Sequence, residues 1–99
     1  MKTTITEKDG KTIVAVQGEL DTDTSKEFQK DVEPLMEKHG LTVEMDFSQL
    51  EYISSKAIRV LISFQQRVIA QGGSLKVVNV QPAVMEIFDM TGLSRSFLE

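Results

Sequence analysis

The stretch LTVEMDFSQLEYISSKAIRVLISFQQRVIAQ, residues 41–71, decides the fold. Its first part, 41–47, predicts a strand, and 52–53 is a short extended segment. From Ser55 to about Gln71, apolar residues recur at helical spacing, and Gly72-Gly73 closes the predicted helix. Its apolar arc is too wide for one contact stripe, so we expect this helix to pack on a sheet and also touch a neighbouring helix.

Upstream, the sequence predicts a β-hairpin. Segments 3–7 and 12–18 flank Asp9-Gly10, a pair that supplies the positive φ angles of a type I′ turn. Within the second segment, 13–16 is nearly continuous in apolar residues, which favours a strand buried on both faces.

A first helix follows the hairpin. Thr24 is the expected N-cap, and Glu27 stands at the capping-box position. Pro34 falls inside the helical pattern and predicts a kink. His39 would lie in the last turn, and Gly40 ends the helix.

The C-terminal third predicts one more strand and one more helix. The strand covers 75–78, and the helix begins at Pro82 and stops at Gly92. Its expected inward residues are Val84, Ile87 and Phe88.

Strands that alternate with helices imply right-handed parallel crossovers. We therefore predict an α/β fold with a four- to five-stranded mixed sheet. It combines the N-terminal hairpin with parallel crossovers, and three or four helices lie mainly on one face. The 99 residues fit a single domain, 1–99.

Composition excludes several classes of function. The chain has no cysteine, which removes disulfides, thiolate metal sites and cysteine nucleophiles. A net charge of −4 argues against nucleic-acid binding, which needs a basic face. No apolar run approaches the roughly 20 residues of a membrane helix, and the first residues lack the apolar core of a signal peptide. We expect a cytoplasmic protein that does not bind membranes.

The residues do not support catalysis or a bound cofactor. The sequence holds no glycine-rich phosphate loop, and His39, its only histidine, lacks a nearby partner that would orient it as a base. Asp21 and Asp23 form a DxD pair, which can bind a hard cation but more often caps a helix. We expect Asp46 and Asp21 to lie together at the carboxyl ends of strands, the edge where ligands of parallel sheets sit.

Two serines precede the helix of 55–71. One of Ser54 and Ser55 is expected to be its N-cap. The exposed amides and partial positive charge of a helix start can also hold a phosphate, so a serine here is a candidate phosphorylation switch. Lys56 is a cation placed against the helix dipole, and Arg59 shares a helix face with Ser55. This arrangement suggests an anion nearby.

The whole chain resembles a STAS domain of the anti-sigma factor antagonist type. Three segments, which follow one another in the family's order, carry the resemblance. VQGELD (16–21) is similar to the family's strand ending in G-E-L-D. MDFSQLEYISS (45–55) is similar to its D-L-S … F-I-D-S-S-G-L, and GGSLKVVNV (72–80) with MTGL (90–93) is similar to its last strand and helix.

The resemblance implies partner switching. The unphosphorylated antagonist binds an anti-sigma factor, a serine-protein kinase of the histidine-kinase-like ATPase fold, and thereby frees a sigma factor. The kinase then phosphorylates the antagonist and the complex dissociates, and a serine phosphatase resets it. The chain itself would be no enzyme, would hold no cofactor or metal, and would be a monomer when free.

The motif places the phosphoacceptor at Ser55, with Ser54 as a possible competitor. Where the family usually has aspartate, serine and glycine around the acceptor, this chain has Ser54, Lys56 and Ala57. The expected contact face combines the start of the second helix, the loop around Asp21 and the third helix. Its partner-binding residues would be Asp21, Asp23, Ser54, Lys56, Arg59, Met85 and Met90.

Three alternatives stay open at this point. The chain could be a STAS interaction module that is never phosphorylated, a sensor of a small ligand or nucleotide in a signalling complex, or a mainly structural subunit.

Overall fold

The computed structural model describes residues 1–92 of the chain. Leu93, the last residue of the third STAS-like segment, lies outside the described residues. In chain order the elements are β1 (Lys2–Lys8), β2 (Lys11–Leu20), α1 (Thr24–Val32), the 3₁₀ helix η1 (Glu33–Glu37), β3 (Thr42–Ile53), α2 (Ser55–Ala70), β4 (Ser74–Val78) and α3 (Pro82–Thr91).

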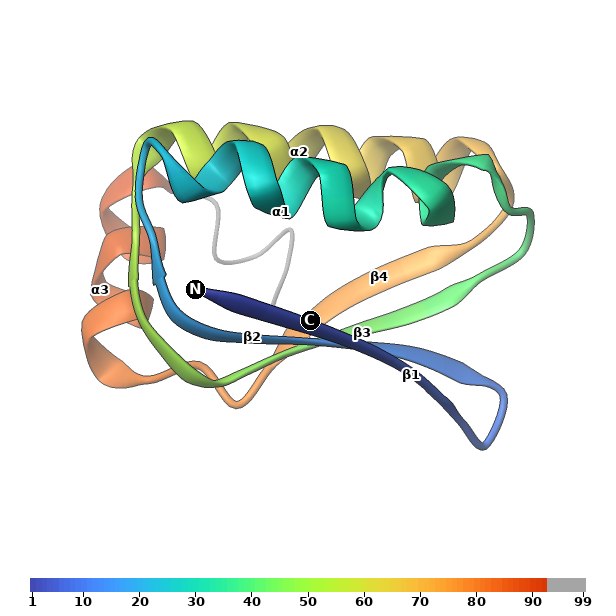
Figure 1. The fold of residues 1–99 in the computed structure, drawn as a ribbon, viewed down its shortest axis with the longest axis horizontal. Coiled ribbons are helices and arrows are strands. Elements are labelled where there is room, and N and C mark those ends of the chain that lie inside the picture. Colours follow the sequence, from blue (N-terminus) through green and yellow to red (C-terminus); the bar gives the residue numbers. More distant parts are fainter. Residues whose placement is uncertain (93–99) are drawn as a thin grey trace.

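The four strands form one mixed sheet in the order β1-β2-β3-β4. β1 and β2 pair antiparallel, while β2 with β3 and β3 with β4 pair parallel. Asp9 and Gly10 have φ angles of 52° and 79°, which confirms the predicted hairpin turn. Figure 1 shows α1 and α2 side by side over one face of the sheet, with α3 at one end. The predicted α/β fold class is therefore confirmed.

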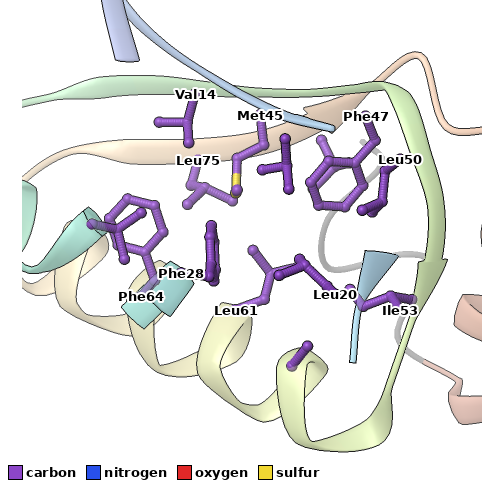
Figure 2. Packing of buried hydrophobic residues seen from close by; sticks show 14 of the residues in the cluster. Val14, Leu20, Phe28, Met45, Phe47, Leu50, Ile53, Leu61, Phe64 and Leu75 are labelled. Atoms are coloured by element: carbon purple, nitrogen blue, oxygen red, sulfur yellow. The ribbon is translucent and has the colours of Figure 1, made fainter. Parts of the chain in front are cut away.

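The core lies between the sheet and the helices α1 and α2. Figure 2 shows the side chains that fill this layer, contributed by every strand of the parallel part and by both helices. Phe28 of α1 and Phe64 of α2 are fully buried there. Phe47 of β3 stacks on Phe88 of α3 with ring centroids 6.4 Å apart, and this contact holds α3 against the end of the sheet. As expected, Val84 and Phe88 of α3 are buried, and Ile87 packs against the core.

The prediction that β2 is buried on both faces was wrong. Val14 and Val16 are buried, but Ile13 and Ala15 on the opposite face are half-exposed. The right-handed crossovers carry α1 and α2 to the same side of the sheet (Figure 1), so no helix of residues 1–92 covers the other face.

The first helix is shorter than predicted. α1 ends at Val32, and η1 continues the chain with Pro34 in its first turn. Because proline lacks the amide that an α-helix needs at this point, the backbone changes to a 3₁₀ helix instead of kinking. His39 consequently lies in a bend beyond the helix and is exposed.

The third strand is longer than predicted. β3 runs without a break from Thr42 to Ile53. Its pairing with β2 changes register twice, between Ala15 and Gln17 and between Gly18 and Glu19 of β2.

The second helix was predicted almost residue for residue, since α2 spans Ser55–Ala70. Among residues 1–92, no helix is both long enough and apolar enough to cross a bilayer.

Candidate functional site

The site lies where β2 and β3 end and α1 and α2 begin. Leu20 pairs with Ile53 at the ends of these strands. The amide of Ser54 donates to the carbonyl of Leu20 at 2.7 Å, so the loop after β2 and the start of α2 lie against each other. Residues more than 30 positions apart in sequence are thereby joined into one surface.

Ser54 is the N-cap of α2. Its backbone is extended, with φ −87° and ψ 164°, and its side-chain oxygen accepts a hydrogen bond from the amide of Ala57 at 3.1 Å. Only 8% of Ser54 is exposed. The sequence left the choice of cap open between two serines, and the structure assigns it to Ser54.

Ser55 is the first residue of α2 and is exposed. Its hydroxyl makes no hydrogen bond with another described residue. The neighbouring serines therefore differ in accessibility and in bonding: the Ser54 side chain is buried and bonded to the helix, whereas the Ser55 side chain is open to solvent at the positive end of the helix dipole.

Asp21 holds the start of α1. Its Oδ1 accepts from the amide of Thr24 at 2.8 Å and lies 3.0 Å from the Thr24 hydroxyl, which itself accepts from the Asp21 amide at 2.9 Å. The bond from the Thr24 amide, followed by that from its hydroxyl, lowers the pKa of Asp21. The predicted capping box was wrong, because Thr24 bonds backward to Asp21 and not forward to the amide of Glu27.

Asp46 does not lie beside Asp21, so the prediction that both sit at one edge was wrong. Because β3 extends to Ile53, Asp46 falls in mid-strand opposite Ala15. Burial acts to raise the pKa of Asp46, but hydrogen bonds from Ser48 and the Asn79 amide group outweigh it and hold this pKa below its ordinary value. These bonds tie β3 to the end of β4, which is a structural role.

The two predicted cations lie on α2 next to Ser55. Lys56 is half-buried and Arg59 is exposed. The first turn of α2 holds no acidic residue, whereas the first turn of α1 holds Glu27. Within residues 1–92, the ion pair of the structure joins Lys11 to Glu44, so neither Lys56 nor Arg59 has a carboxylate partner there.

The third helix lies at this end of the molecule (Figure 1). Met90 is 86% exposed, whereas Met85 is half-buried.

Sequence reasoning missed Tyr52 as a site residue, although it is 44% exposed and two positions before Ser54. In the sequence, Glu51 and Tyr52 stand between the apolar residues Leu50 and Ile53, which breaks the alternation typical of a strand. In the structure both are exposed.

Asp23 is exposed and makes no side-chain cap bond to α1. In the part of the chain that the structure describes, no group of three or more His, Cys, Asp or Glu residues could hold a metal ion. The DxD pair of Asp21 and Asp23 thus has no further protein ligand among residues 1–92.

The family model of the STAS domain matches residues 2–99. The anti-sigma-B factor antagonist of Bacillus subtilis is 30% identical over 80 residues, which cover 81% of this chain and 72% of that protein.

Two solved structures share the fold. An anti-sigma factor antagonist from Mycobacterium paratuberculosis matches with a TM-score of 0.85 at 24% identity, over 97% of this chain and 81% of the other. The Bacillus cell fate determinant SpoIIAA, solved in its phosphorylated form, matches with a TM-score of 0.73 at 15% identity, over 98% of this chain and 89% of the other.

Proposed function

The chain belongs to the STAS domain family, and we propose that it is a cytoplasmic anti-sigma factor antagonist that works by partner switching. The name of the Bacillus subtilis relative supports the first part of this proposal. In the unphosphorylated state the chain binds an anti-sigma factor, a serine kinase of the histidine-kinase-like ATPase fold, and a sigma factor is released. The chain acts as a regulator and not as an enzyme, and it is a monomer when free.

The switch is phosphorylation of Ser55. The kinase transfers the γ-phosphoryl group of its ATP to Ser55 Oγ, whose proton leaves, and ADP departs. The complex then dissociates, and a serine phosphatase restores the hydroxyl. The observation that carries this assignment is the contrast between the two serines: Ser55 is exposed and unbonded, whereas Ser54 is buried and holds the cap of α2.

The local structure can accept the phosphate without unfolding. The amides of the first turn of α2 and the helix dipole favour an anion at this place. A phosphoserine adds a charge of about −1.5 to −2 at pH 7. The fold itself is compatible with the modification, since SpoIIAA has the same fold and has been solved in a phosphorylated form.

The proposed contact face surrounds Ser55. It combines the two helix starts with the exposed part of α3, and Tyr52 adds an aromatic side chain of the kind enriched at interfaces. Its residues are Asp21, Asp23, Tyr52, Ser54, Lys56, Arg59, Met85 and Met90. A phosphate at the centre of this face would add negative charge to it and disfavour a partner that fits the uncharged serine.

The proposal is tested with the variant Ser55→Asp against the anti-sigma factor encoded by the same host. We expect its affinity to fall at least tenfold in calorimetric titration, since the carboxylate brings charge into the contact face. The matched control is Ser74→Asp, an exposed serine at the start of β4, which should bind as the wild type does. Equal affinity of Ser55→Asp and wild type would show that the chain docks without a switch at Ser55.

A further inference from the structure

A groove between α1, η1 and α2 lies next to the proposed switch. Its cavity has a volume of about 270 Å³, enough for an apolar side chain of a partner. Met36 and Val60 give it an apolar floor, and the remaining lining residues are polar or cationic. The full lining is Gln29, Met36, Lys56, Arg59, Val60 and Ser63.

One wall of the groove is fixed by hydrogen bonds between the helices. The carbonyl of Met36 accepts from Arg67 Nε at 3.2 Å and from Gln71 Nε2 at 3.2 Å. Arg67 is thus used to hold η1 against α2. The groove is therefore formed before any partner arrives, and little ordering has to accompany binding.

The charge of the groove is opposite to that of the chain. The chain carries a net charge of −4, yet the lining includes two cations and no acidic residue. Unlike the Arg67 side chain, the side chains of Lys56 and Arg59 make no hydrogen bond or ion pair with another residue of 1–92. Two uncompensated cations beside an apolar floor fit a ligand that presents carboxylates next to an apolar side chain.

We propose that this groove binds an acidic amphipathic helix of a partner protein. Lys56 and Arg59 lie one helical turn apart, so carboxylates one turn apart on the partner helix can reach both cations. An apolar side chain between those carboxylates enters the groove over Met36 and Val60. The identity of the partner as an anti-sigma factor rests on the proposed function, whereas the chemistry of the groove does not.

The groove also gives the switch at Ser55 a second route of action. Ser55 precedes Lys56 and lies one turn before Arg59 on the same face of α2. A phosphate on Ser55 pairs with these cations and removes them from the partner helix. Phosphorylation then weakens the groove as well as the contact at the serine itself.

The probe for the groove is a synthetic 14-residue amphipathic helical peptide of glutamate and leucine, titrated into ¹⁵N-labelled protein. We expect amide shifts centred on the groove residues of α1, η1 and α2. The variant Lys56→Glu/Arg59→Glu should bind the peptide at least tenfold more weakly, and Lys56→Gln/Arg59→Gln should fall between it and the wild type. Circular dichroism melting verifies that each variant is folded.

Two controls isolate the charge of the groove. Lys8→Glu/Lys76→Glu makes the same change in net charge at exposed lysines outside the groove and should leave peptide affinity unchanged. A lysine–leucine peptide of the same length should not bind. The proposal is overturned if the glutamate peptide does not bind, if it shifts residues elsewhere, or if the Lys56→Glu/Arg59→Glu variant binds it as the wild type does.

The anti-sigma factor separates this inference from the proposed function. If it binds the wild type and the Lys56→Glu/Arg59→Glu variant equally, the groove proposal fails while the proposed function stands. If it binds neither, but the glutamate peptide binds the wild type with the expected dependence on Lys56 and Arg59, the groove proposal stands and the proposed function fails.

Discussion

The first turns of α1 and α2 lie side by side at one end of the sheet but are built differently. The cap of α1 is a carboxylate, because Asp21 accepts a hydrogen bond from the amide of Thr24, and Glu27 adds a negative charge in the first turn. The cap of α2 is the neutral side chain of Ser54, and its first turn has no acidic residue but contains Lys56. Only α1 therefore has the anionic charge that favours a helix start.

This difference indicates separate roles for the two helix starts. The start of α1 already has carboxylates beside the positive end of its helix dipole, so it requires no anionic ligand. The start of α2 has a neutral side-chain cap at the amide of Ala57 and no acidic residue in its first turn, which leaves a place for an added anion at the exposed Ser55.

The largest effect on folding is expected from Ser54→Ala, which removes the neutral cap. We expect the free energy of unfolding to fall by about 1 kcal/mol, because the amide of Ala57 loses its partner. Ser55→Ala should change it by less than about 0.5 kcal/mol, since an exposed and unbonded hydroxyl is removed. Urea denaturation measures both values, and a reversed order would mean that the cap is Ser55.

A smaller change is expected from Lys56→Glu, which replaces the cation in the first turn of α2 by an anion. The free energy of unfolding should rise by about 0.3–1 kcal/mol, because the new charge favours the helix dipole. The matched control is Lys26→Glu in the first turn of α1, where neighbouring carboxylates oppose another negative charge. A gain at Lys26 that equals or exceeds the gain at Lys56 would contradict the proposed difference between the two helix starts.

The smallest effect is expected on the pH dependence of stability, through Asp21 at the start of α1. The pKa of Asp21 is lower in the folded chain than its ordinary value of 3.8, so its stabilisation is present above that value and is lost as the pH falls below it. Asp21→Asn should therefore be less stable than the wild type at neutral pH, with the difference shrinking from about pH 4 downward. Thermal melts at several pH values measure this difference. Asp23→Asn, at a side chain that makes no cap bond, should show no such trend.

Local chemistry made much of the fold predictable from sequence. Asp9-Gly10 specified the hairpin, Pro82 and Gly92 bounded α3, and the apolar arc of α2 indicated its contact with a second helix. The errors arose where the outcome depended on distant elements. Whether Ile13 is covered depends on which side the crossovers take, which the residues of a single strand do not encode.

The candidate site was likewise predictable from the sequence only in part. The helix start with its paired serines was visible in the sequence, but the choice between Ser54 and Ser55 needed backbone geometry. Asp46 was misplaced because the pairing of β3 with β2 continues for several residues beyond it. The groove could not be found from sequence, since it joins Gln29 and Met36 to α2 only after the helices pack.

The most direct test of partner switching is peptide mass spectrometry on the chain purified from its native host, together with the proteins that co-purify with it. The account predicts phosphate on Ser55, none on Ser54, and a histidine-kinase-like ATPase among the bound proteins. An unmodified Ser55 under growth and stress conditions, with no such ATPase bound, would contradict it and leave Ser55 as an exposed first residue of α2 without a regulatory role.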